Sequence, residues 1–187
     1  MAIILPKQVG TEEGRLLFQK SEEVKTFDEA RAIVASLKET LDYYGGVGLA
    51  APQIGIPKRV FIVDIKNTLS YKEKYPEGEE IGFVAYVNPS IVEISDQKNK
   101  DFEGCLSVIY GSLFGIVERA DFLKIEYFDP QGKRHIDEIR NPFHARVVQH
   151  EFDHLEGIIF LQRMRTKDFS ELVWEEERDI RKIDKKK

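Results

Sequence analysis

Cysteine is nearly absent from this chain, which has Cys105 alone among its 187 residues. A single cysteine cannot form an internal disulfide, which is typical of proteins from a reducing compartment. The sequence lacks a run of about 18 apolar residues that could span a bilayer, and residues 1–6 lack the basic start of a signal peptide. The net charge of −5 offers no basic surface for duplex nucleic acid. We therefore expect a cytoplasmic protein, or one from an organelle matrix, with no membrane partner and no specific nucleic-acid partner.

The composition that remains is ordinary for a globular protein, with 42% hydrophobic and 33% charged residues. At this length we expect a single domain over residues 1–187. Thr26 followed by Glu29 is a capping-box pattern, and apolar residues then recur at steps of three and four as far as Tyr44. This pattern predicts a helix that ends at the glycine pair 45–46. A short helix is also expected around residues 12–19.

Strands are predicted in the middle of the chain. Runs rich in β-branched and aromatic residues occur at 59–65 and at 82–94, the second broken at Asn88. Residues 121–140 have the pattern of a β-hairpin around a turn rich in proline and glycine. The charged segment 66–80 is expected to be an exposed loop. Because strands precede one late central helix without βαβ alternation, we expect an α+β fold with antiparallel sheets packed around that helix.

The late helix contains an H-E-x-x-H motif at residues 150–154. On an α-helix, His150 and His154 lie one turn apart on the same face, where both imidazoles can bind one metal ion. Glu151 follows the first histidine, so its carboxylate can reach a water molecule at that ion. Asn141 as N-cap, followed by proline, supports the start of the helix. The motif predicts a metal site with Glu151 as its base.

The segment 46–55, GVGLAAPQIG, formally matches the dinucleotide-binding fingerprint G-x-G-x-x-A. That fingerprint must follow a strand and open a helix, whereas here a helix comes first and Pro52 lies inside the segment, so we reject the match. Two interpretations remain open. The segment is either a plain connector or a loop whose glycines let the backbone approach a ligand, with Gln53 as an amide donor.

Two histidines need a third ligand from elsewhere in the chain. In one class of metallopeptidases this ligand is a glutamate further along, and Glu171 and Glu175 lie at a suitable separation. Cys105 is the other candidate, although a lone cysteine is more often a small buried hydrophobic residue. Spacing alone leaves both candidates open.

Three segments together resemble the signature motifs of the peptide deformylase family: GVGLAAPQIG at 46–55, EGCLS at 103–107 and QHEFDHLEG at 149–157. They follow one another in the family's order, and the resemblance covers a core from about residue 26 to about residue 164, with the tail 165–187 outside it. It implies a metal-dependent enzyme that hydrolyses the N-formyl group of N-formylmethionine at the N-terminus of newly made polypeptides and releases formate.

The resemblance also implies a ligand set and a partner. Cys105, His150 and His154 would hold one divalent metal ion. The family favours Fe²⁺, although these donors also suit Zn²⁺, Ni²⁺ or Co²⁺. The partner would be a nascent formyl-Met peptide, with transient docking on the ribosome as a further expectation.

Catalytic and substrate-binding roles follow from the same resemblance. Glu151 would act as the catalytic acid and base, while the Gln53 side chain and the backbone N–H of Leu106 would stabilise the oxyanion. The residues expected to bind the substrate backbone as an added strand are Gly46, Val47 and Gly48. Glu103 is expected to be structural, paired with Arg119.

The sequence departs from the family pattern at residues 107–119, where a usual proline is missing and the segment is longer. The family places its methionine pocket beside this segment. This departure motivates a second hypothesis, a deformylase-like protein that binds without turnover. The H-E-x-x-H motif leaves a third hypothesis open, an endopeptidase that uses Glu171 or Glu175. Residues 143–148, with the charged loop 66–80, look closer to the subgroup related to organellar deformylases. In the tail, a helix is expected from Asp168 onward, capped with Glu171 three residues later.

Overall fold

The computed structural model describes residues 3–65, 81–164 and 171–178. Its strands are β1 (Gly48–Ala50), β2 (Val60–Ile65), β3 (Gly82–Ile94), β4 (Lys98–Gly104), β5 (Leu113–Ala120), β6 (Leu123–Phe128), β7 (Arg134–Ile139) and β8 (Val173–Trp174). Its helices are α1 (Phe27–Tyr44), α3 (Pro142–Leu155) and α4 (Phe160–Arg163), and its 3₁₀ turns are η1 (Glu13–Phe18), η2 (Ala51–Ile54) and η3 (Ile109–Gly111).

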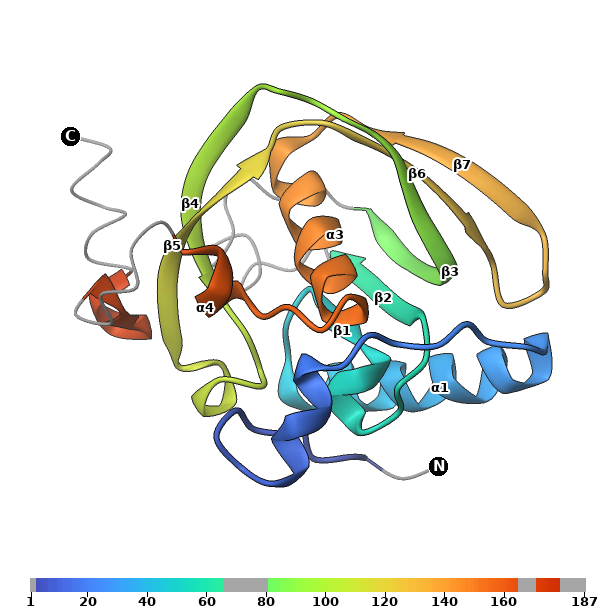
Figure 1. Ribbon diagram of the computed structural model, residues 1–187, viewed down its shortest axis with the longest axis horizontal. Helices are drawn as coiled ribbons and strands as arrows, with labels where there is room; N and C mark the ends of the chain where they lie inside the picture. The colour runs from blue at the N-terminus through green and yellow to red at the C-terminus, as the bar shows by residue number, and fades with distance from the viewer. Residues whose placement is uncertain (1–2, 66–80, 165–170, 179–187) are drawn as a thin grey trace.

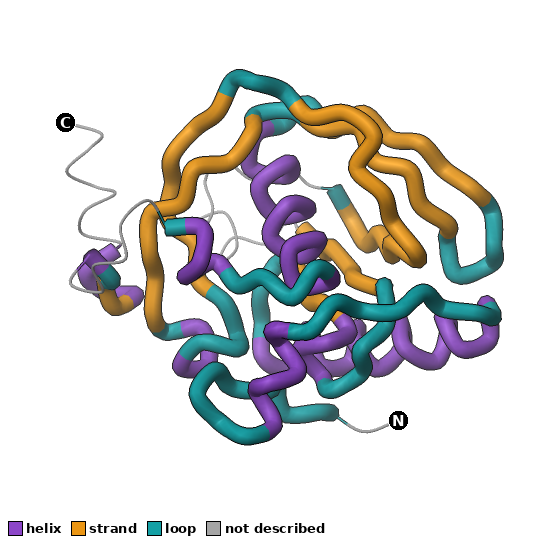
Figure 2. The backbone as a smooth tube through the Cα atoms, in the orientation of Figure 1, coloured by secondary structure: helices purple, strands orange, loops and turns teal. Residues whose placement is uncertain are grey.

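Two antiparallel sheets surround the central helix. One sheet has the strand order β1-β2-β3-β6-β7 and the other the order β4-β5-β8. Figure 1 shows α3 in the middle of the molecule, with the long strands β3, β6 and β7 curving over it and α1 on the far side of β1 and β2. Figure 2 shows the orange strands curving around the purple central helix, and every pair of named strands in the two sheets is antiparallel, so these pairs contain no βαβ crossover. The predicted α+β fold, with antiparallel sheets around a central helix, is confirmed.

Helix α1 begins and ends where its capping residues predict. The Thr26 side chain accepts a hydrogen bond from the Glu29 N–H, and Gly45 follows the last helical residue with a φ of +75°. The apolar face of α1 is buried, with Leu37 and Leu41 almost completely covered. This helix packs against β1 and β2, so it covers one face of the larger sheet.

Strand β2 explains why the central helix α3 packs so closely against the larger sheet. All six of its residues are buried because both of its faces are covered. Val60 and Ile62 face the core beneath α1, whereas Phe61 and Val63 face the core beneath α3, as the alternation of side chains along a strand requires. The central helix is therefore held against the sheet by an apolar layer.

The predicted strands need one refinement. The break expected at Asn88 is a shift in register within the continuous strand β3, where Asn88 has a φ of +50°. Its side chain hydrogen-bonds both the N–H and the C=O of Val24, which fastens the irregular residue. The hairpin expected at 121–140 forms as β6 and β7.

The smaller sheet contains the largest differences from expectation. Strands β4 and β5 were not assigned from the sequence, and they pair from Lys98 opposite Ala120 to Gly104 opposite Phe114. The helix predicted from Asp168 is wrong at β8, because these residues pair with β5 instead. Residues 175–178 are helical, and the rest of that tail lies outside the described residues, as does the predicted loop 66–80. Across the described ranges, none of the helices has the length and apolarity to span a membrane.

Candidate metal centre

Helix α3 places the motif residues on its buried face. Asn141 accepts a hydrogen bond from the His144 N–H at 2.9 Å, Pro142 occupies the first turn, and the helix ends at Leu155. His150 and His154 are 9% and 1% exposed, and their ring centroids are 5.1 Å apart. The predicted arrangement of two imidazoles on one helical face is therefore present.

Cys105 joins these histidines from the loop after β4. The Cys105 Sγ lies 3.3 Å from the His154 Nε2, and one ligand atom from each of Cys105, His150 and His154 lies within 4.8 Å of the other two. Among the described residues, no other group of three such side chains meets that criterion. The Glu171 and Glu175 alternative is therefore not supported, and the third ligand candidate is the cysteine.

Glu103 orients the first histidine. Its Oε2 accepts a hydrogen bond from the His150 Nδ1 at 2.9 Å, which leaves the Nε2 of that ring for a metal. The Nε and Nη2 of Arg119 donate to the same carboxylate at 2.8 and 2.9 Å, and Arg146 Nη1 donates at 2.8 Å. The expected pairing of Glu103 with Arg119 is confirmed. Burial acts to raise the pKa of Glu103, but the charges and hydrogen bonds of Arg119 and His150 together outweigh it and lower that pKa strongly, so the carboxylate stays ionised.

The charged network continues along α3 to Asp153. Arg119 also donates to Asp153 at 2.5 Å, and Arg163 binds the same carboxylate through two nitrogens at 3.0 and 2.7 Å. Sequence reasoning gave no role to Arg146 or Asp153. A signal was available, because Arg146 precedes His150 by one helical turn and a charge on a buried face needs a partner.

Gln149 fastens the helix to the smaller sheet. Its Oε1 accepts a hydrogen bond from the Ala120 N–H at 3.1 Å, and its Nε2 donates to the Ala120 C=O at 2.9 Å. The amide therefore bonds both backbone groups at the end of β5. This contact fixes the position of α3 relative to the smaller sheet, from which the loop that contains Cys105 extends.

The electrostatics of the cluster suit a cation. Burial disfavours the charged form of His150, but hydrogen bonds to Cys105 and Glu103 outweigh burial and raise its pKa well above the ordinary value. The negative groups that favour a proton there would equally favour a metal ion. Burial, followed by the charge of His150, lowers the pKa of His154 well below the ordinary value, which keeps that ring neutral as a ligand must be. The soft sulfur and the two imidazoles suit Fe²⁺, Zn²⁺, Ni²⁺ or Co²⁺.

Glu151 lies buried beside the cluster. It is 4% exposed, and its Oε2 has no hydrogen-bond partner among the described residues. Burial raises the pKa of this carboxyl to about 7, in the range where a group can both accept and return a proton. The other oxygen approaches the main chain of Gly48, where an added Cβ would lie 2.5 Å from it. Only glycine leaves room for Glu151 at that position.

The side chain of Gln53 points towards the cluster because its carbonyl oxygen is held elsewhere. The Ala50 N–H donates to the Gln53 Oε1 at 2.8 Å, so the amide nitrogen must face the other way. That nitrogen lies 3.3 Å from both the Cys105 Sγ and the Ser107 Oγ. Of the two interpretations of segment 46–55, the loop close to a ligand is the one that this geometry favours.

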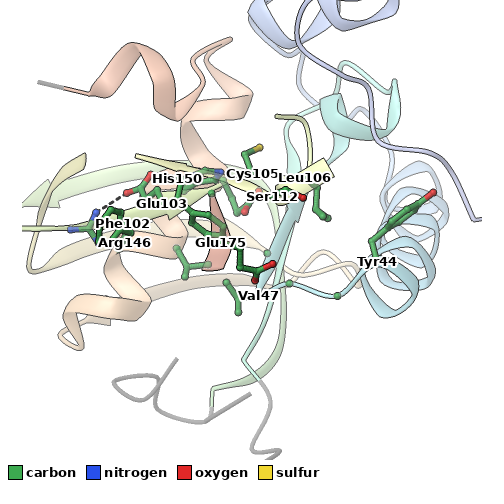
Figure 3. Close-up of a pocket in the computed structure, with 18 of the residues that line it drawn as sticks. Tyr44, Val47, Phe102, Glu103, Cys105, Leu106, Ser112, Arg146, His150 and Glu175 are labelled. Carbon is green, nitrogen blue, oxygen red and sulfur yellow. Dashed lines mark hydrogen bonds and ion pairs between the residues drawn. The ribbon is translucent and has the colours of Figure 1, made fainter. Parts of the chain in front are cut away.

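The predicted site residues meet around one cavity of about 270 Å³. The predicted site residues that line it are Gly46, Val47, Gly48, Gln53, Cys105, Leu106, His150 and Glu151, whereas His154 is not part of the lining and contacts the Cys105 Sγ. Figure 3 shows that the lining side chains come from distant parts of the chain, with a dashed line joining Glu103 and Arg146. The edge strand β1 forms one side of the cavity, and the loop after β4 forms another.

The N-terminal segment also supports the site, although its sequence gave no reason to expect this. The Gln8 Nε2 donates to the Leu106 C=O at 2.8 Å, and the Val9 N–H donates to the Ser107 C=O at 2.9 Å. Lys7 adds a backbone bond to Gln53 at 2.7 Å. These contacts hold the two loops that present Gln53 and Cys105.

Comparison with known proteins gives a consistent result. A family model described as Polypeptide deformylase matches residues 6–170. Peptide deformylase 1 of Bacillus subtilis is 39% identical over 159 residues, which cover 84% of this chain and 89% of that protein. Peptide deformylase 2 of Pseudomonas syringae pv. tomato is 41% identical over 142 residues, which cover 76% of this chain and 74% of that protein.

Solved structures agree with these relatives. The crystal structure of peptide deformylase from Thermotoga maritima aligns with a TM-score of 0.75 and 32% identity, covering 89% of this chain and all of that one (100%). A class I type b peptide deformylase from Acinetobacter baumannii, crystallised with Met-Ala-Ser bound, aligns with a TM-score of 0.77 and 34% identity over 87% of this chain and 99% of that one. The chain therefore belongs to the peptide deformylase family, enzymes that remove the N-formyl group from nascent peptides.

Proposed function

We propose that this chain hydrolyses the formyl amide of N-formylmethionine peptides with Cys105, His150 and His154 holding one divalent ion. The observation that carries the proposal is the position of Glu151, whose carboxylate lies in the same cavity as this ligand cluster with one oxygen left for a proton. The N–H of His150 that is already donated to Glu103 fixes which ring nitrogen faces the ion.

The reaction adds water across the formyl C–N bond. A bound divalent ion supplies Lewis acidity, which acidifies water and polarises the formyl carbonyl. Glu151 accepts a proton from the attacking water molecule while the oxygen of that water bonds to the formyl carbon. The carboxyl then returns that proton to the leaving nitrogen as the C–N bond breaks, which gives formic acid and a free amine. Because the amine is the stronger base, it takes the proton of formic acid, and the products are formate and a peptide with an ammonium terminus.

The developing oxyanion needs donors fixed in advance. Gln53 is suited to this because the Ala50 N–H already holds its carbonyl oxygen, which keeps its Nε2 aimed at the cluster before a substrate oxygen arrives. The Leu106 N–H is the second proposed donor, in the loop that Gln8 holds in place. Losing one such donor is expected to reduce kcat by about 10² or more.

The peptide backbone is proposed to bind along β1. This strand lies at the edge of the larger sheet, so a peptide can add to it as a further strand. Gly46 has a φ of +128°, and Gly48 admits Glu151 beside the main chain, so this segment combines an open edge with the catalytic carboxylate. The Met-Ala-Ser complex of the Acinetobacter baumannii relative supports a site for the residues that begin a polypeptide.

We further propose Fe²⁺ as the native ion, the cytoplasm as the compartment and residues 1–187 as one domain. A thiolate ligand such as Cys105 must stay reduced to bind metal, which favours a reducing compartment. A nascent formyl-Met peptide is the proposed partner, met through transient docking on the ribosome.

The experiment uses protein prepared without oxygen and loaded with Fe²⁺. Formate should be released from formyl-Met-Ala-Ser, should stop when a chelator removes the ion and should return when Fe²⁺ is added back. Cys105→Ala should abolish metal binding. Retention of metal in that variant, or absence of formate from the loaded wild type, would contradict the proposal.

A further inference from the structure

The cavity has an outer wall built from two segments. One is the loop 109–112, within the stretch that departs from the family motif, and the other is residues 171–178, which lie beyond the residues that the family model matches. Tyr110, Gly111 and Ser112 from the loop, with Glu175 and Arg178 from the C-terminal segment, line the same cavity as the metal cluster. These segments are far apart in the sequence, so only the fold brings them together.

The C-terminal segment is attached to the smaller sheet by backbone pairing. Trp174 pairs with Leu113 and Val173 with Phe114, and the Glu175 N–H donates to the Ser112 C=O at 3.1 Å. Val173 is 1% exposed and packs with Phe102 and Phe114 in a small apolar cluster. The segment is therefore part of the fold and continues the wall begun by the loop.

Arg178 ties this wall to the loop of the metal ligand. Its side chain is buried, and its guanidinium lies 4.2 Å from the centroid of the Phe114 ring. That ring covers Gly104, where an added Cβ would lie 2.5 Å from it. Because Gly104 directly precedes Cys105, the Phe114 ring packs between Arg178 of the wall and the loop that contains the metal ligand.

The mouth of the cavity presents an aromatic ring and a carboxylate. Tyr110 is 55% exposed, and its N–H is held by the Gln8 Oε1 at 3.1 Å despite a φ of +52°. The Glu175 side chain is 40% exposed, with its carboxylate 3.7 Å from the buried Arg178. A backbone held in a sparsely populated conformation at a binding site is a feature that the surrounding structure must maintain.

We propose that Tyr110 and Glu175 form a specificity-determining wall that binds the peptide just after its formyl-methionine and favours a cationic side chain there. The inference rests on the proposed function. The reacting bond lies at the buried cluster, and a nascent chain must continue outward through the mouth, so the side chains at the rim meet the residues that follow the first. A carboxylate attracts a cation, and an aromatic face adds to that attraction.

The first test compares two peptides, formyl-Met-Lys-Ser and formyl-Met-Ala-Ser. Wild type should show the higher kcat/KM for the lysine peptide, and Glu175→Gln should reduce that preference by about two- to five-fold, the size of one exposed ion pair. The change should lie in KM, with kcat kept. Glu176→Gln is the matched control. It removes the same charge from the same segment, but Glu176 does not line the cavity. Equal preference in wild type and Glu175→Gln would overturn the inference.

A second pair of variants tests the aromatic side of the wall. Tyr110→Ala should raise KM for both peptides several-fold, whereas Ile109→Ala should not, although Ile109 is 50% exposed in the same loop and also has positive φ. A loss in kcat with unchanged KM, or equal effects of the two variants, would show that the loop acts only through the fold.

Hydrogen exchange separates this inference from the proposed function. The tripeptide Met-Lys-Ser, added to metal-loaded wild type, should slow exchange of the Glu175 N–H and its neighbours in residues 171–178. If formate is not released but this protection appears, the proposed function fails and the wall stands. If formate is released and bound peptide leaves the segment unprotected, the wall is overturned and the proposed function stands.

Discussion

Two buried carboxylates lie near His150, and their hydrogen-bond partners differ. Glu103 accepts hydrogen bonds from two arginines and from the histidine, and its pKa is lowered. Glu151 is equally buried but keeps an oxygen without a partner among the described residues, and burial raises its pKa to about 7. The same chemical group therefore serves as a fixed anion in one region and as a proton carrier in the other.

The two carboxylates need different surroundings because they have different roles. An ion pair surrounded by donors holds a ligand ring in place but cannot exchange a proton near neutral pH. A buried carboxyl with few hydrogen-bond donors costs stability, yet it has the pKa that proton transfer requires. The hydrogen bonds around Glu103 hold the ligand ring in place, and the raised pKa of Glu151 suits it to proton transfer.

The largest expected effect comes from removing the proton carrier. Glu151→Gln keeps the size of the side chain but cannot accept a proton, so kcat for formate release should fall by about 10² to 10⁴. Metal content should stay at the wild-type level because the three ligands are unchanged, and elemental analysis of the same sample checks this. Full turnover in the variant would remove Glu151 from its proposed role.

Removing an arginine that pairs with Glu103 should instead lower the free energy of unfolding. Arg119→Met leaves Glu103 and Asp153 without their shared cation, and the free energy of unfolding should fall by about 3–5 kcal/mol in urea titrations. Arg140→Met is the matched control, since Arg140 pairs with Glu138 at the surface and should change stability by less than about 0.5 kcal/mol. Similar losses in both variants would argue against the buried network.

The raised pKa of Glu151 predicts a pH effect in metal-free protein. Because the folded-state pKa of about 7 lies above the ordinary value of 4.5, the protonated carboxyl favours folding below pH 4.5, and that contribution is lost as pH rises to 7. The wild type should lose about 3 kcal/mol over this window relative to Glu151→Gln. Urea unfolding of both proteins at several pH values measures the difference, and parallel profiles would contradict it.

The smallest of these effects concerns metal affinity. Glu103→Gln keeps an oxygen near the His150 Nδ1 but removes the charge, so the affinity for the divalent ion should fall by about 10- to 100-fold. A competition titration against a coloured chelator measures it, with circular dichroism confirming that the variant is folded. Unchanged affinity would mean that the helix alone orients His150.

Sequence reasoning was most accurate where the signal lies within one element. The caps at Thr26 and Asn141, and the hairpin of β6 and β7, depend on neighbouring residues and were confirmed. Strand β4 was missed because its sequence, KNKDFEG, is mostly polar and has little preference for a strand. It forms because β5 supplies a partner along its whole length.

From the sequence alone it follows that two imidazoles share one helical face and that a carboxylate comes directly after the first of them, since helical periodicity is a local property. The sequence also left two candidates for the third ligand, because spacing along a chain does not measure distance in space. Only the tertiary structure brought Cys105 to within 3.3 Å of a histidine 49 positions away, and only strand pairing placed the C-terminal segment against the cavity. Contacts of this kind depend on how separate elements pack, and no single segment specifies them.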